Sequence, residues 1–169
     1  MTADLARSHP LESRAAALAA VGVTVAPYVA MANVRAATGH PAPANTWVPA
    51  GDGHSIWLGP DEWLVTSPTE TPWALAARLL AAGHDAVTDV SAQRITLRLT
   101  GEHVRDVLAT GCAIDLHPRA FPPGSSAQTT LARAGVILLA LGDGYLLLVR
   151  SSFAGYLADW LLDACTEFR

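Results

Sequence analysis

The residues with the greatest capacity for chemistry are concentrated in the segment GCAIDLHPRAFPPG at 111–124. This segment contains a thiol (Cys112), a carboxylate (Asp115), an imidazole (His117) and a guanidinium (Arg119). Such groups could supply a nucleophile and an acid or base if the fold brought them together. The alternative is that the segment is a loop that positions something else.

The thiol and the carboxylate both have simple structural interpretations. Cys112 directly follows Gly111, which is expected to end a helix, and its surroundings are apolar. A cysteine in that setting is typically a small buried hydrophobe rather than a reactive thiolate. Asp115 is expected to accept backbone hydrogen bonds within the loop. Catalysis by this segment is therefore disfavoured.

The prolines of the segment indicate a rigid loop that suits docking. Pro118 holds the preceding residue in an extended conformation, and the run 122–124, Pro-Pro-Gly, stiffens the exit. Arginine and aromatic residues are frequent among the residues that dominate protein interfaces. We therefore predict no catalytic, cofactor-binding or metal-binding residue here, and an interface formed by His117, Arg119 and Phe121.

The rest of the chain carries no familiar catalytic motif. GDGHSI (51–56) and GDGYLL (142–147) lack the third glycine of a dinucleotide fingerprint and predict turns, and GxSxG is absent. Six histidines are scattered without an HxH or HxxxH pair, so no metal site is predicted. All eleven positive residues are arginines, which excludes a P-loop lysine and a pyridoxal Schiff base.

Composition indicates one domain of 169 residues with few charges, 15% of the chain against 51% hydrophobic residues. Either part of the apolar surface faces a partner protein, or the many alanines fill the core and are also scattered singly over the surface. The net charge of −4 disfavours nucleic-acid binding, and no apolar run is long enough to span a membrane. The N-terminus lacks signal-peptide features and the two cysteines have no metal-binding spacing, so we expect a cytoplasmic protein.

Periodicity predicts alternating helices and hairpins after a flexible arm at 1–10. Helices are expected over 11–22, 71–83 and 101–111, and hairpins over 55–67 and around the turn at 142–144. RITLRLT (94–100) alternates as a strand with one buried face. A C-terminal helix is expected to bury one stripe, formed by Phe153, Tyr156, Leu157, Trp160, Leu161 and Ala164.

The two hairpin–helix units repeat each other without a gap. Residues 63–82, WLVTSPTETPWALAARLLAA, align with 145–164, YLLLVRSSFAGYLADWLLDA. Convergence on a common pattern could also produce these matches. We predict an α+β fold of pseudo-duplicated β-hairpin/helix units, with a mixed or antiparallel sheet packed against helices. Residues 11–169 would form one domain with repeat halves of about 11–83 and 84–169, sharing a sheet.

Several long motifs resemble the gamma subunit of heterotetrameric sarcosine oxidase. These are GPDEWL, GCxxDLHPRxF, AQTxLxxAGV and RxSFAxYLxxWL, and the likeness spans about residues 10–168. More distantly, DVSAQRITLRLTGEHVRDVLATG is similar to the folate-binding domain of glycine-cleavage aminomethyltransferases, which is itself built from a duplicated α+β unit. Ala92-Gln93-Arg94 and Ser125-Ser126 depart from the expected pattern of the first family.

The resemblance implies a subunit of an enzyme that oxidises sarcosine to glycine with release of hydrogen peroxide. The methyl carbon would pass to tetrahydrofolate or leave as formaldehyde. The partner subunits would hold FAD, FMN, NAD, tetrahydrofolate and zinc, while this chain would bind no cofactor and would pack mainly on the alpha subunit, in a complex with beta and delta.

The alternative is a free-standing folate-binding module of the aminomethyltransferase type. Such a module needs a carboxylate for the pterin ring and an arginine for the glutamate tail. Asp89 with Arg94 or Arg98 is the set that the sequence offers.

Overall fold

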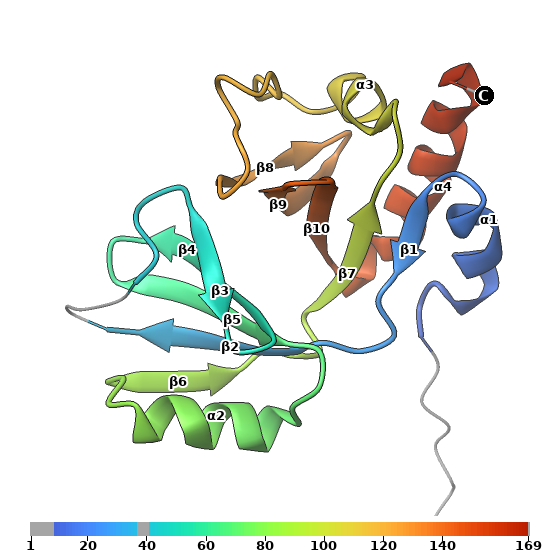
Figure 1. Ribbon diagram of the computed structural model, residues 1–169. Coiled ribbons are helices and arrows are strands. Elements are labelled where there is room, and N and C mark those ends of the chain that lie inside the picture. Colours follow the sequence, from blue (N-terminus) through green and yellow to red (C-terminus); the bar gives the residue numbers. More distant parts are fainter. Residues whose placement is uncertain (1–8, 37–40, 169) are drawn as a thin grey trace, which may run out of the picture.

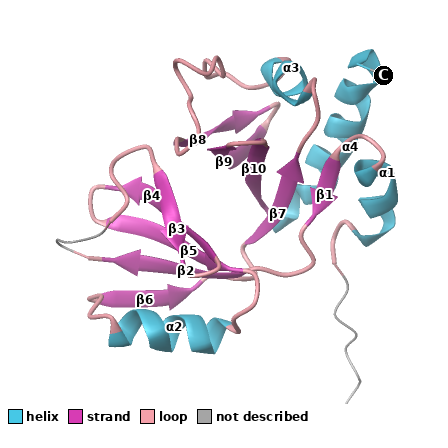
Figure 2. Cartoon of the chain, in the orientation of Figure 1, coloured by secondary structure: helices cyan, strands magenta, loops and turns pink. Residues whose placement is uncertain are grey.

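The computed structural model describes residues 9–36 and 41–168, so most of the predicted arm at 1–10 lies outside the described residues. The described chain folds into two antiparallel five-stranded sheets with helices on their outer sides (Figures 1 and 2). The predicted α+β class is confirmed. The predicted single shared sheet is wrong, because each hairpin–helix unit belongs to a sheet of its own.

The first sheet has the strand order β3-β4-β5-β2-β6. Its strands, in the order of the chain, are β2 (Ala30–Arg35), β3 (Trp47–Ala50), β4 (Gly53–Gly59), β5 (Glu62–Ser67) and β6 (Ala86–Asp89). The predicted hairpin over 55–67 is the β4–β5 pair, in which Ile56 lies opposite Leu64. Residues on one face of β2 and β5 form a small apolar cluster with helix α2.

Helix α2 (Pro72–Ala81) forms for the reasons that its sequence predicts. The Thr71 hydroxyl accepts a hydrogen bond from the Ala74 N–H, Pro72 occupies the first turn, and Gly83 adopts a positive φ just beyond the end. Leu75 and Leu79 are buried against the sheet. Trp73 and Leu80 are seven residues apart, so they lie on one helix face, and they are 84% and 53% exposed.

The second sheet has the strand order β1-β7-β10-β9-β8. Its strands are β1 (Val23–Val25), β7 (Arg94–Leu99), β8 (Ser126–Leu131), β9 (Ala134–Leu141) and β10 (Gly144–Arg150). The predicted hairpin at 142–144 joins β9 to β10. The edge strand β1 comes from the N-terminal part of the chain and pairs antiparallel with β7, with Thr24 opposite Arg98.

The outer face of the second sheet is covered by helical segments that form the largest apolar core with it. The α-helices are α1 (Ala15–Ala19), α3 (Val104–Ala109) and α4 (Ala154–Ala164), and short 3₁₀ helices run over Glu12–Arg14, Ser151–Phe153 and Cys165–Phe168. The predicted helices over 11–22 and 101–111 are confirmed but are shorter than expected.

Helix α4 buries only part of the predicted stripe, since Leu157 and Leu161 are buried as expected. The buried positions are Ala154, Leu157, Ala158 and Leu161. Phe153 and Tyr156 are exposed, and Trp160 is only partly buried. Small alanines face the sheet, and the bulky aromatic side chains lie toward the edge of the contact, because a helix packs closest where its side chains are small.

The inner faces of the two sheets pack on each other. Met31, Ile56 and Leu64 of the first sheet form one apolar cluster with Ile137, Leu139 and Leu148 of the second. Strands β9 and β10 are therefore apolar on both faces because they lie between the helices and the other sheet. Burial on both faces accounts for the apolar runs VILLAL (136–141) and YLLLVR (145–150) by contacts within the chain.

The two sheets correspond to each other strand by strand. When the order of the second sheet is reversed, its strands β8-β9-β10-β7-β1 lie beside β3-β4-β5-β2-β6 of the first. In this comparison β5 corresponds to β10 and β6 corresponds to β1. Leu75 of α2 and Leu157 of α4, which align in the sequence repeat, are both fully buried. The two sheets do not coincide with the predicted repeat halves of 11–83 and 84–169, because β1 belongs to the second sheet and β6 belongs to the first. Descent from a duplicated unit stays a prediction.

Candidate functional site

The loop at 111–124 is held by hydrogen bonds that the sequence partly predicts. The Asp115 carboxylate accepts the backbone N–H of His117 at 2.8 Å, as expected. The His117 carbonyl in turn accepts the N–H groups of Ala120 and Phe121 at 2.8 and 2.9 Å. These bonds form a compact turn that is held by backbone N–H groups of the loop itself.

The end of this loop joins the two sheets. The Gly124 N–H donates to the Ala140 carbonyl of β9, and the Gly124 carbonyl accepts the N–H of Trp47 in β3, at 3.0 and 2.9 Å. The Trp47 indole N–H also donates to Ala140, at 2.9 Å. The loop is therefore a structural connection between the sheets as well as a surface feature.

The three predicted interface residues separate into two classes. His117 and Arg119 are exposed, so their role in an interface stays a prediction. Phe121 is only 8% exposed and stacks on Tyr145 with ring centroids 6.5 Å apart. The expectation that Phe121 docks a partner is corrected: its side chain belongs to the core of this chain, and alanine there would weaken the fold.

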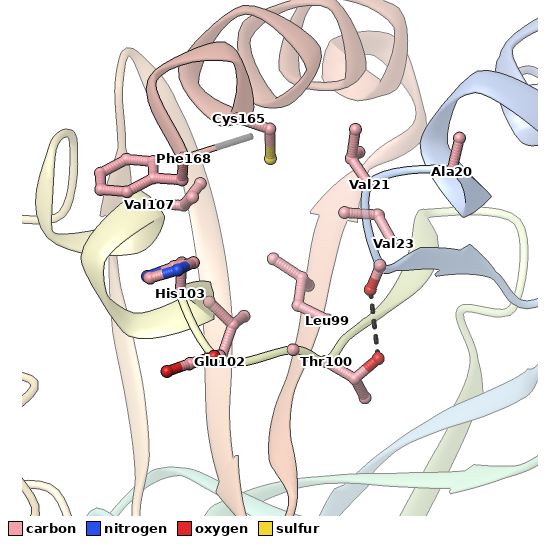
Figure 3. A pocket seen from close by; sticks show the side chains of 13 residues that line it. Ala20, Val21, Val23, Leu99, Thr100, Glu102, His103, Val107, Cys165 and Phe168 are labelled. Carbon is pink, nitrogen blue, oxygen red and sulfur yellow. Dashed lines mark hydrogen bonds between the residues drawn. The ribbon is translucent and has the colours of Figure 1, made fainter.

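A pocket of about 250 Å³ lies between the α1–β1 turn, the β7–α3 turn and the C-terminal segment. Figure 3 shows Val21, Val23, Leu99 and Val107 among the side chains that line it. The Thr100 N–H and hydroxyl both donate to the Gly22 carbonyl, at 2.9 and 3.3 Å, which ties two of its walls together. The walls are mainly apolar.

The polar groups at this pocket do not form a catalytic arrangement. His103 stacks on Phe168 with ring centroids 5.8 Å apart, and its Nδ1 lies 3.5 Å from a carboxylate oxygen of Asp106. His103 is thus oriented by its own helix and by the C-terminal segment. The pocket suits an apolar side chain better than a polar reactant, since apolar contact is most of what its walls provide.

Two carboxylates have lowered pKa values because they accept hydrogen bonds from other parts of the chain. The pKa of Asp159 is lowered by the hydrogen bonds and charge of Arg14, at 2.6 and 3.0 Å, which tie α4 to the N-terminal helical segment. The pKa of Asp52 is lowered by hydrogen bonds from Thr69 and Ser67. The partners of these two carboxylates are hydroxyl groups, a backbone N–H and an arginine, and no histidine that could act as a general base is among them.

Asp89 and Arg98, two of the groups that the sequence offers for folate, are paired with other residues of this chain. Asp89 is occupied by Ser91, whose N–H and hydroxyl it accepts at 2.9 and 2.6 Å. Arg98 forms an ion pair with Asp143 at the opposite end of β7 from Arg94. Within 9–36 and 41–168, no group of three or more histidine, cysteine, aspartate and glutamate side chains could hold a metal ion. His40 lies outside the described residues.

Sequence reasoning missed two surface features. The first is the exposed apolar face of α2 with Trp73, which lies off the stripe defined by Leu75 and Leu79 and could have been found from that spacing. The second is the pairing of Arg94 with Arg150, the first residue of β7 and the last of β10. No local pattern reveals it, because the two strands are far apart in the sequence.

The family model of the sarcosine oxidase gamma subunit matches residues 22–167. The chain belongs to this family. The gamma subunit of sarcosine oxidase from Corynebacterium sp. (strain P-1) is 43% identical over 117 residues, which cover 67% of this chain and 57% of that protein. The gamma subunit from an Arthrobacter species is 40% identical over 136 residues, covering 78% and 66%. The chain thus spans less than two thirds of the length of both relatives.

Membership in the gamma subunit family is matched by the three-dimensional structure. A chain of heterotetrameric sarcosine oxidase from Corynebacterium sp. U-96, in complex with pyrrole 2-carboxylate, superposes with a TM-score of 0.85. The likeness covers 96% of this chain and 96% of that chain, at 31% identity. No helix of the described residues is long and apolar enough to cross a membrane.

Proposed function

We propose that this chain is the gamma subunit of a heterotetrameric sarcosine oxidase in the cytoplasm. The complex would oxidise the N-methyl group of sarcosine, release glycine and hydrogen peroxide, and pass the methyl carbon to tetrahydrofolate or release it as formaldehyde. The observation that carries this proposal is the structural likeness over nearly the full length of both chains, at a TM-score of 0.85.

The role of this chain in that complex would be structural. It would pack on the alpha subunit, with beta and delta in the same assembly, while FAD, FMN, NAD, tetrahydrofolate and zinc would belong to the partners. The finer fold assignment, to the aminomethyltransferase folate-binding type, is supported by the matching strand orders of the two sheets.

The exposed face of α2 is the part of the surface best suited to the alpha subunit. Trp73 is 84% exposed and shares this face with Leu80. A large aromatic side chain that the chain itself does not bury is unusual, and tryptophan is prominent among interface hot spots. Burial of Trp73 by a partner would remove its apolar surface from water and contribute about 2 kcal/mol or more to association.

Co-expression with the partner subunits tests this function. The wild-type chain should co-purify with an assembly that produces hydrogen peroxide from sarcosine, whereas the purified chain alone should be colourless and inactive. Trp73→Ala should weaken association about tenfold or more without lowering the thermal midpoint of the free chain. Asp163→Ala, at an exposed position on α4, is the control and should assemble as the wild type does.

Two outcomes would contradict the proposal. Stoichiometric flavin or peroxide production by the free chain would show that it is not a structural subunit. Micromolar binding of tetrahydrofolate by the free chain would favour the folate-binding module instead.

A further inference from the structure

Two arginines lie directly opposite each other on neighbouring strands of the second sheet. Arg94 begins β7, Arg150 ends β10, and the two residues are register partners. Their side chains extend from the face that packs on the first sheet, because the alternate positions Ile95 and Val149 contact the helical side. The Ser151 N–H donates to the Gln93 carbonyl at 3.0 Å and fixes the two strand ends together.

This juxtaposition is electrostatically unfavourable in the chain by itself. Like charges directly opposite across an antiparallel pair repel each other. Burial, followed by the charge of Arg150, lowers the pKa of Arg94. In the described part of the chain, neither guanidinium lies within ion-pair distance of a carboxylate, and the side-chain hydrogen bond found for Arg94 is to the neutral amide of Gln93.

The space beside the two arginines is open. One cavity of about 510 Å³ is lined by Arg94, Arg150, Gln128 and Gly135, and a second, of about 420 Å³, shares the first three of these residues. A side chain at position 135 would meet no atom within 4 Å of its Cβ, so the glycine leaves room next to Arg150. Both cavities are open to solvent and border one another at the arginines.

One carboxylate does face this space, and it limits what can bind there. Glu62 lines the second cavity and raises the pKa of Arg94, although burial and Arg150 outweigh it. Glu62 itself accepts a hydrogen bond from the Asn33 amide at 2.6 Å and pairs with Arg35 at 3.1 Å. Its negative charge would oppose a dianion such as phosphate more strongly than a singly charged group.

We propose that the groove beside Arg94 and Arg150 binds a carboxylate group. Guanidinium groups match the planar, two-oxygen geometry of a carboxylate, and two of them on adjacent strands can hold it from both sides. Thr129 and Thr130 of β8 line the same space. The bound negative charge would relieve the repulsion between the two arginines.

The carboxylate could come from a free small molecule or from an acidic side chain of a bound subunit. The first source is independent of the proposed function, whereas the second rests on it. The free chain therefore tests the site, and the assembled complex tests the source.

In the free chain, the probe is sodium acetate, and its binding is detected by the NMR signals of the arginine side chains. Sodium chloride at matched ionic strength is the reference. Saturable shifts of two arginines are expected. Arg150→Gln should weaken acetate binding about tenfold or more, because it removes charge-assisted hydrogen bonds. The control Arg133→Gln, in the exposed turn between β8 and β9, should leave binding unchanged.

A stability measurement separates a binding residue from a structural one. Without acetate, Arg150→Gln should raise the thermal midpoint of the free chain by roughly 1–3 °C, since it removes a like-charge contact. A structural arginine would lower the midpoint instead. Acetate shifts that persist in Arg150→Gln, or phosphate binding as tight as that of acetate, would overturn the carboxylate site.

In the complex, two results identify the source of the carboxylate. If acetate still binds and Arg150→Gln assembles normally, the ligand is a free molecule. If acetate binding is lost on assembly and Arg150→Gln, unlike Arg133→Gln, weakens association, a side chain of the partner occupies the groove.

Discussion

Leu157→Ala tests how α4 packs on the second sheet. Leu157 is fully buried, whereas the preceding Tyr156 is 42% exposed. Truncation of a fully buried leucine removes its contacts and leaves a cavity, so the free energy of unfolding should fall by about 3–4 kcal/mol. Tyr156→Ala should lower it by about 1 kcal/mol or less, although tyrosine is the larger side chain.

Urea denaturation followed by tryptophan fluorescence measures both variants. With a slope of about 2 kcal/mol per molar urea, the midpoint should fall by roughly 1.5–2 M for Leu157→Ala and by less than about 0.5 M for Tyr156→Ala. Equal shifts, or a larger shift for Tyr156→Ala, would show that the aromatic stripe predicted from periodicity is the buried one and that the observed helix orientation is wrong.

Three further changes probe the interior. Thr96→Val should raise the thermal midpoint, because the buried Thr96 hydroxyl has no hydrogen-bond partner among the described residues. Gly111→Ala should lower the free energy of unfolding by about 1–3 kcal/mol in denaturant melts, since its Cβ would lie 2.5 Å from the Trp160 ring. The pKa of His54 is lowered by burial and by Arg98, so the unfolded chain binds a proton first as the pH falls. The free energy of unfolding should therefore decrease as the pH falls below about 6.5. In melts of His54→Gln at the same pH values, this decrease should be smaller.

Local sequence signals predicted most of the secondary structure of this chain. The Thr71-Pro72 start and the Gly83 end of α2 act within a few residues, so they can be read directly from the sequence. The hairpins around 60–61 and 142–143 are also local, because a short turn forces neighbouring strands to pair.

Pairing between distant segments could not be predicted in the same way. No sequence feature of the β1 segment assigns it to the second sheet. The predicted single sheet, shared by both halves, would be consistent with the same pattern of apolar residues. The prediction for Phe121 rests on an aromatic residue in a rigid, proline-framed loop, whereas its contact with Tyr145 depends on the position of β10, which is distant in the sequence. The prediction was wrong for Phe153 and Tyr156 of α4, because hydrophobicity alone does not distinguish close packing of alanines from partial burial of larger rings.

Each sheet has one edge strand from the other predicted half of the chain, β1 in the second sheet and β6 in the first, and this arrangement affects how the chain folds. Strand β1 leaves the ribosome before every strand of the first sheet, yet it must wait for β7 before it can pair. The second sheet is thus completed around a fully synthesised first sheet, and its closure spans a long loop, which slows folding. A cut between residues 83 and 84 would separate β1 from its partner and β6 from its own sheet, so neither fragment should fold by itself. We therefore expect the two sheets to unfold together, as one cooperative unit.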